Sequence, residues 1–181
     1  MNSVVPPVDV SDAYRFCPIC GAARSQFEPA RPFRCKSCGH TSFFGPVTAV
    51  GGVIVNGEGK VLLIERARDP GAGKLGMPGG FVDPYETAEE SLHREVWEEV
   101  GVKIEGLRFL MNHPNRYTYH GITSPVLDLF YFAKVCELQV VSVAASEVSG
   151  WMWTELTPEV LDRMAFESNR IALEHYLSLS K

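Results

Sequence analysis

The pattern of apolar and polar positions divides the chain into short strands and a few helices. Apolar runs bounded by Gly, Pro and Asn predict strands at residues 47–55, 60–65, 104–111, 125–136 and 148–153. The turn at residues 56–59 joins the first two strands, and a loop rich in Gly and Pro follows at residues 69–80. Helical patterns close the chain at residues 158–164 and 167–179. Taken alone, this order of elements indicates an α+β fold.

The best-specified helix covers residues 86–100. One face carries an apolar stripe made of Ala88, Leu92, Val96 and Val100. Gly101 follows the last turn, where a left-handed cap is expected. Glu86, Glu90 and Arg94 are spaced four residues apart, which predicts a ladder of ion pairs that orients Arg94.

Three carboxylates lie close together near the end of this helix. Glu95, Glu98 and Glu99 occupy positions i, i+3 and i+4, so they share one helix face at the edge of the apolar stripe. Like charges at this spacing repel one another, and a hard divalent cation such as Mg²⁺ removes the repulsion. The alternative is a solvated acidic face with no ligand.

A longer motif contains these carboxylates. The sequence has Gly80, then five residues, Glu86, then seven residues, and the run Arg94-Glu95-Val96-x-Glu98-Glu99-x-Gly101-Val102. This spacing resembles the signature of the Nudix hydrolases at every defined position, and the lead-in Met77-Pro78-Gly79-Gly80 is similar to that family as well. The resemblance covers roughly residues 46–160. It implies an α/β/α sandwich with a mixed sheet.

The resemblance also implies an activity, namely hydrolysis of a nucleoside diphosphate linked to another group, with Mg²⁺ or Mn²⁺ as cofactor. By residue-for-residue similarity, Glu95, Glu98, Glu99 and the Gly80 carbonyl would bind the catalytic metal. Glu98, Glu99 and Arg94 would form the catalytic machinery, and Arg94 would pair with Glu86.

A further carboxylate often comes from a later loop in this family. Glu147 precedes a Trp-bearing strand, in the position where related chains carry such a glutamate, and is the candidate ligand or base; its alternative is a surface acid. Asp128, within an apolar strand, is either a half-buried carboxylate near the site or an outward-facing residue. His113, His120 and His175 have no metal partner at ligand spacing.

Upstream of the motif lie two cysteine pairs. Their four cysteines form two Cys-x-x-Cys-Gly motifs: Cys17, Cys20, Cys35 and Cys38. This spacing suits a structural Zn²⁺ site of four thiolates, whereas the alternative is two disulfides. The first residues show no signal peptide, which predicts a cytoplasmic protein and favours zinc over disulfides. The fifth cysteine, Cys136, lies in an apolar run and is expected to be a small buried residue.

The domain organisation follows from these features. The chain has 181 residues, which suffice for one ordinary domain and a small module. We expect a flexible tail at residues 1–14, a zinc ribbon at residues 15–43 and a Nudix hydrolase domain at residues 46–181. The ribbon has too few apolar residues to fold without metal.

The substrate is less well specified. A four-cysteine ribbon before a Nudix domain resembles the NADH pyrophosphatase group, but that group carries a Ser-Gln-Pro-Trp-Pro-Phe-Pro signature that this chain lacks at residues 111–123. Where ADP-ribose-specific members carry a proline, the neighbourhood in this chain is Tyr117-Thr118. Members that act on diadenosine polyphosphates carry a tyrosine nearby, for which Tyr117 or Tyr119 would serve. We expect Arg116, Tyr117 and Tyr119 to form a substrate-binding loop.

Charge and hydropathy limit the partners. The net charge of −5 and a sequence pI of about 5.5 argue against general binding to a nucleic-acid backbone, and no stretch is suited to a membrane. Two alternatives stay open besides hydrolysis of a small nucleotide: a regulator that senses a nucleotide without cleaving it, and hydrolysis at a capped RNA 5′ end. Basic residues of the ribbon support both alternatives, and a homodimer is also left open.

Overall fold

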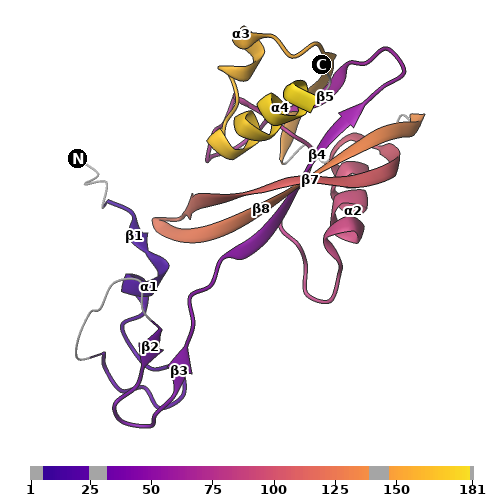
Figure 1. Ribbon diagram of the computed structural model, residues 1–181. Coiled ribbons are helices and arrows are strands. Elements are labelled where there is room, and N and C mark those ends of the chain that lie inside the picture. The colour runs from indigo at the N-terminus through magenta and orange to yellow at the C-terminus, as the bar shows by residue number, and fades with distance from the viewer. Residues whose placement is uncertain (1–5, 25–31, 139–146, 180–181) are drawn as a thin grey trace. The chain divides into compact units, whose positions relative to one another are not determined.

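The computed structural model describes residues 6–24, 32–138 and 147–179. The chain divides into two compact units (Figure 1). The larger unit comprises Thr48–Asn115 and Leu127–Lys181, and the smaller comprises Met1–Val47 and Arg116–Val126.

The order of elements alternates strands with a few helices. In the described residues they are β1 (Val8–Asp9), α1 (Val10–Ala13), β2 (Phe33–Arg34), β3 (Thr41–Ser42), β4 (Val47–Val55), β5 (Val61–Arg66), β6 (Leu75–Gly76), α2 (Ala88–Val100), β7 (Val102–Tyr119), β8 (Ile122–Leu138), β9 (Val148–Thr154), α3 (Pro158–Leu161) and α4 (Glu167–Leu179).

The main sheet is mixed, as predicted. Over the described part of the chain it has seven strands. Five follow the path β1-β8-β4-β5-β6, and the other two lie off this path, with β7 paired to β8 and β9 paired to β5. Strand β5 is antiparallel to β4, β6 and β9, whereas β1 runs parallel to β8.

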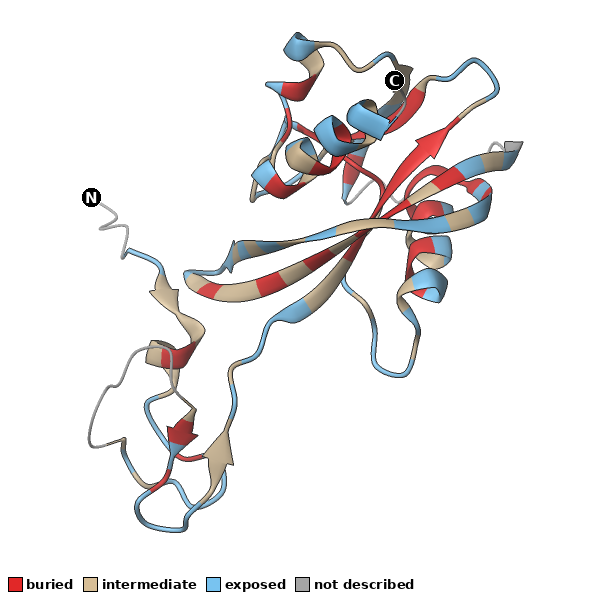
Figure 2. Cartoon of the chain, viewed as in Figure 1, coloured by how far each residue is buried: buried red, intermediate tan, exposed pale blue. Residues whose placement is uncertain are grey.

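Helices cover both faces of this sheet in the larger unit. Successive side chains of β5 point to opposite faces, so Leu62 and Ile64 belong to one apolar cluster while Val61 and Leu63 belong to another. The first cluster contains the apolar stripe of α2, and the second contains residues of α3 and α4. The buried residues therefore concentrate on the central strands (Figure 2), and the α/β/α arrangement is confirmed.

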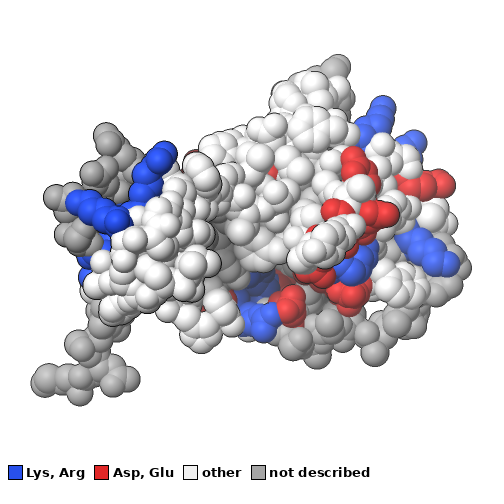
Figure 3. Space-filling model, turned by 90° about the horizontal axis from the view of Figure 1, so that it is seen from below, with Lys and Arg blue, Asp and Glu red and all other residues white. Residues whose placement is uncertain are grey.

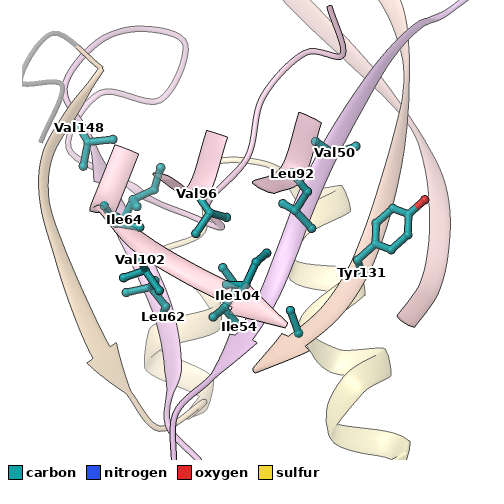
Figure 4. Packing of buried hydrophobic residues seen from close by; sticks show 12 residues of the cluster. Val50, Ile54, Leu62, Ile64, Leu92, Val96, Val102, Ile104, Tyr131 and Val148 are labelled. Carbon is teal, nitrogen blue, oxygen red and sulfur yellow. The ribbon is translucent and has the colours of Figure 1, made fainter. Parts of the chain in front are cut away.

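The cluster beneath α2 fixes the position of that helix. Leu92 and Val96 have no exposed surface and pack with residues of β4, β5 and β7, as Figure 4 shows for Ile54, Leu62 and Ile104. Full burial of one such side chain contributes about 1.5–3 kcal/mol. This packing fixes the helix against the sheet.

The smaller unit has its own core. Cys17, Phe33 and Cys35 are buried there, and the ring of Tyr14 packs edge-on against Phe33, with centroids 5.4 Å apart. Strands β2 and β3 pair antiparallel. This core is small, and the dependence of the segment on a metal for its stability stays a prediction.

Three expectations from the sequence differ from the structure. The segment expected to be a flexible tail contains β1 and α1 within residues 8–13. Residues 112–119, expected to form a loop, continue β7 as one arm of a hairpin with β8. Cys136 is exposed rather than buried, and its thiol donates a hydrogen bond to the Lys103 carbonyl at 3.3 Å.

Two boundaries also shift. Helix α2 begins at Ala88, two residues later than expected, and α3 ends at Leu161. None of the helices in the described residues is both long and apolar enough to cross a membrane.

Candidate active site

The acidic helix α2 is defined by a cap at each end. At its start, the Thr87 hydroxyl accepts a hydrogen bond from the Glu90 N–H at 3.2 Å, and the Glu90 carboxylate accepts one from the Thr87 N–H at 2.8 Å. At its end, Gly101 adopts φ 63° and donates to the Trp97 carbonyl. The predicted ladder is therefore wrong at Glu90, whose carboxylate belongs to the cap. Glu86 precedes the helix.

The three glutamates differ sharply in exposure. The Glu99 residue is 6% exposed, the Glu95 side chain 13% and the Glu98 side chain 54%. This gradient follows from the helix geometry, since Glu95 and Glu99 each directly precede a buried valine of the apolar stripe. Two of the three carboxylates are thus largely removed from water.

A glycine pair brings the backbone against these two carboxylates. The Gly79 N–H donates to Glu99 Oε2 at 2.9 Å, and a Cβ on Gly79 would lie 2.1 Å from the Val50 carbonyl oxygen. A Cβ on Gly80 would lie 2.5 Å from Glu95 Oε1, so only glycine fits there while Glu95 keeps this position. The Gly80 carbonyl accepts a hydrogen bond from the Val50 N–H at 2.8 Å, and a carbonyl oxygen has a second lone pair.

Arg94 connects the carboxylates. Its guanidinium makes two hydrogen bonds to Glu86, at 2.6 and 3.2 Å, and its Nη1 contacts Glu95 at 2.9 Å and Glu98 at 3.3 Å. The hydrogen bonds from Arg94 lower the pKa of Glu86 to about 2. The pairing of Arg94 with Glu86, expected from the resemblance, is present.

Burial raises the pKa values of the inner carboxylates. Desolvation raises the pKa of Glu99 to about 8, and the neighbouring charges of Glu95 and Glu147 act in the same direction against the Gly79 hydrogen bond. Burial also raises the pKa of Glu95, against the opposing effect of Arg94. Both groups bind protons at neutral pH more readily than an exposed glutamate, and a divalent cation would compete for the same oxygens.

Glu147 lies near this cluster, directly before β9. The negative charge of Glu147 contributes to the raised pKa values of both Glu95 and Glu99. The Ala67 N–H donates to its carbonyl at 2.9 Å, and its carboxylate forms an ion pair with Arg68. The structure thus brings the late carboxylate to the acidic helix. Arg68 lies far from Glu147 in the sequence, and no sequence pattern predicts this ion pair.

The glutamates do not converge on one point in this structure. Over the described residues, only the four ribbon cysteines bring three or more ligand atoms within 4.8 Å of one another. Arg94 lies against Glu95 and Glu98 instead. The donor set nevertheless suits Mg²⁺, since it offers carboxylate oxygens beside a glycine pair whose backbone approaches them closely.

The four cysteines form a compact thiol cluster. Cys17 Sγ lies 3.7 Å from Cys38 Sγ, and Cys20 Sγ lies 3.6 Å from Cys35 Sγ, far beyond the disulfide bond length of about 2.05 Å. Tetrahedral zinc with Zn–S bonds of about 2.3 Å separates its sulfurs by about 3.8 Å. Hydrogen bonds from the backbone lower the pKa of Cys35 to about 7, whereas, against a hydrogen bond from the His40 backbone, hydrogen bonds with the other cysteines and burial raise the pKa of Cys38 to about 12. The cluster has the size that zinc requires.

The expected substrate-binding residues lie on the β7–β8 hairpin. Arg116 and Tyr119 belong to β7; Arg116 pairs with Asp9 at 3.8 Å, and the Tyr119 ring packs edge-on against His120. Tyr117 also belongs to β7. All three are assigned to the smaller unit, whereas the glutamates belong to the larger.

Asp128 is buried and serves another element. It is 6% exposed, accepts hydrogen bonds from Ser168 of α4 at 2.5 Å and from Asn115 of β7 at 2.9 Å, and burial raises its pKa. It therefore does not face outward. Its partners indicate that it anchors α4 to the sheet.

Comparison with known proteins identifies the family of this chain. A family model described as the NUDIX domain matches residues 45–174, and the chain therefore belongs to the NUDIX family. A solved MutT NUDIX hydrolase from Burkholderia pseudomallei is 30% identical, with a TM-score of 0.60 over 72% of this chain and 98% of that one.

Curated relatives are hydrolases. The NAD-capped RNA hydrolase NudC of Chromobacterium violaceum is 35% identical over 97 residues, which cover 54% of this chain and 36% of that protein. The ADP-ribose pyrophosphatase of Methanocaldococcus jannaschii is 40% identical over 76 residues, covering 41% of this chain and 44% of that protein. The chain thus matches less than half the length of these relatives.

Proposed function

We propose that this protein hydrolyses the diphosphate bond of a nucleoside diphosphate linked to another group, with Mg²⁺ or Mn²⁺ as cofactor. The observation that carries the proposal is the desolvated pair Glu95 and Glu99, held against the backbone of Gly79 and Gly80. Arg94 contacts Glu95 and the Gly79 N–H donates to Glu99, so one cation and one backbone donor face the two buried carboxylates. The relatives' names, with NAD-capped RNA and ADP-ribose as substrates, support a dinucleotide-type substrate.

The residues would hold the cofactor as follows. Glu95, Glu98 and Glu99 of α2, with the Gly80 carbonyl, offer three carboxylates and one carbonyl as ligands. A bound divalent cation would supply Lewis acidity toward the phosphoryl oxygens. Arg94 would keep Glu86 as its partner while it releases Glu95 and Glu98, and so would fix the orientation of the helix edge.

Glu147 is the proposed proton acceptor. Its side chain is 49% exposed, so water reaches it, and it lies close enough to Glu95 and Glu99 to affect their charges. A carboxylate in this position can take the proton of an attacking water. Arg68 forms an ion pair with this carboxylate.

Two further assignments belong to the same proposal. The cysteines of the ribbon would bind one structural Zn²⁺ through Cys17, Cys20, Cys35 and Cys38. The hairpin residues Arg116, Tyr117 and Tyr119 would contact the nucleotide. Arginine recognises phosphate, and an aromatic ring stacks on a base.

A hydrolysis assay with matched variants tests the proposal. NADH, ADP-ribose, diadenosine polyphosphates, sugar nucleotides and NAD-capped RNA are incubated with and without Mg²⁺, and products are separated by chromatography. Glu98→Gln should lower kcat on the order of 10²–10³-fold, as does loss of one well-placed electrostatic contributor. Glu90→Gln is the control, because glutamine preserves the capping box.

The outcomes separate an enzyme from a sensor. Cleavage that requires the metal and is lost in Glu98→Gln supports the hydrolase. Tight binding of a nucleotide without cleavage, at saturating Mg²⁺ and across the whole panel, would refute it in favour of a regulator.

A further inference from the structure

The ribbon differs from the rest of the chain in charge. In the sequence, residues 15–43 contain five Arg and Lys residues and one Glu, whereas the whole chain has 17 basic and 22 acidic residues. A segment of net charge +4 therefore lies within a chain of net charge −5. Figure 3 shows Lys and Arg side chains on the ribbon and a concentration of Asp and Glu on the larger unit. The net negative charge of the whole chain therefore does not describe the ribbon, which is basic.

The ribbon also exposes large apolar side chains. Phe16 is 64% exposed, Ile19 70% and Phe43 78%, whereas Phe33 of the same module is 3% exposed. Phe33, Tyr14 and Phe44 already fill the ribbon core. The exposed rings of Phe16 and Phe43 are therefore additional to what the fold needs.

The turns of the two cysteine motifs explain this arrangement. Cys17 and Cys35 point inward to the thiol cluster, so the residues beside them point outward. Arg34 and Lys36, on either side of Cys35, are both exposed, as is Phe16 next to Cys17. A module of about 30 residues is only about 20 Å across, so these cations and rings lie within the reach of a few nucleotides.

We infer that the ribbon is a binding surface for single-stranded RNA. Sequence-tolerant binding of single strands combines cations that follow the phosphates with rings on which bases stack, and the ribbon offers both. A purely acidic peptide would use the cations but leave the rings unused. The relatives named for NAD-capped RNA make RNA, rather than DNA, the favoured strand. Binding by the ribbon goes beyond the proposed hydrolysis, since it does not need the glutamates.

The test measures binding without any cleavable bond. A fluorescent single-stranded RNA of about 12 nucleotides with a 5′-hydroxyl end, within the usual site sizes of roughly 4–16 nucleotides, is titrated with the zinc-loaded full chain by anisotropy. Single-stranded DNA of the same sequence and a polyglutamate peptide serve as competitors.

Two variants probe the two components of the surface. Arg34→Glu with Lys36→Glu should weaken binding and lower the slope of log affinity against log salt by about 1–2, since each phosphate contact of a single strand contributes about 0.7. Phe16→Ala with Phe43→Ala should weaken binding by roughly 5- to 150-fold for each stacked base lost. The matched control is Lys103→Glu with Lys134→Glu, two exposed cations on the larger unit.

The inference stands if both ribbon variants lose affinity, keep one zinc per chain and hydrolyse a small dinucleotide at the wild-type rate, while the control binds normally. It is overturned if the control loses as much affinity as the ribbon variants, or if polyglutamate displaces RNA equally well. Wild-type protein that fails to bind RNA at about 50 mM salt overturns it too. Because hydrolysis of the small dinucleotide is measured separately, failure of RNA binding does not count against the hydrolase.

Discussion

Replacing Glu99 with glutamine should stabilise the metal-free protein, and the gain should grow with pH. Glu99 is 6% exposed, and desolvation raises its pKa from 4.5 to about 8. An acid whose pKa is higher in the folded state binds its proton more tightly there. Its contribution to stability is therefore complete below pH 4.5, the ordinary pKa, and is lost as the pH rises toward 8. Glutamine keeps the size of the side chain and cannot ionise.

The magnitude follows from the size of the shift. One pKa unit corresponds to about 1.4 kcal/mol. Between pH 5 and pH 8 the wild type should lose on the order of 3–4 kcal/mol of unfolding free energy from this group, and Glu99→Gln should not. Such a difference shifts the melting temperature of a domain of this size by several degrees or more.

The assay is urea unfolding in EDTA at pH 5, 6, 7 and 8. Glu98→Gln is the control, because the Glu98 side chain is 54% exposed and its replacement should change stability little at any of these pH values. Adding Mg²⁺ at pH 8 should stabilise the wild type more than Glu99→Gln, since a ligand that binds only the folded state adds to stability. An advantage of Glu99→Gln that is independent of pH, or that shrinks as the pH rises, would refute the reasoning.

Three further outcomes are expected. Gly79→Ala should destabilise the protein by more than about 1 kcal/mol in thermal unfolding, because its Cβ would lie 2.1 Å from the Val50 carbonyl oxygen at a φ of 141°; Gly57→Ala, with open space around its Cβ, is the control. Tyr117→Ala or Tyr119→Ala should raise KM more than it lowers kcat, since stacking acts on ground and transition states alike; unchanged KM in both would place base recognition elsewhere. Metal analysis should find close to one zinc per chain, and strong chelation should unfold the ribbon, visible by proteolysis; zinc-free protein with paired thiols would contradict this.

The sequence predicts most of the larger unit because its strongest signals are local. The apolar stripe and Gly101 define α2 with its C-terminal cap, and the apolar runs of β4, β5 and β9 are long enough to identify strands. The exception, Glu90, was ambiguous because its spacing fits both an ion pair with Arg94 and a capping box with Thr87. The extended backbone conformation of Thr87 at the N-cap favours the capping box over the ion pair.

The hairpin could not be predicted for a physical reason. Residues 113, 115 and 117 of β7 alternate in burial with their exposed neighbours, as a strand requires. The half-buried positions are occupied by His113, Asn115 and Tyr117. Because these residues carry polar groups, the sequence lacks the alternation of apolar and polar residues that would predict a strand. The approach of Glu147 to the acidic helix could be inferred only from the family resemblance, because its contacts depend on tertiary structure.

Arg94 gives the acidic helix a counter-ion of its own. Its guanidinium already contacts Glu95 and Glu98, so the proposed divalent cation would compete with a tethered one rather than enter a cluster of uncompensated negative charge. Under the proposed function, the affinity of the site for metal would be a difference between two attractions. A change that strengthens or weakens the hold of Glu86 on Arg94 would then adjust it without altering any of the proposed metal ligands.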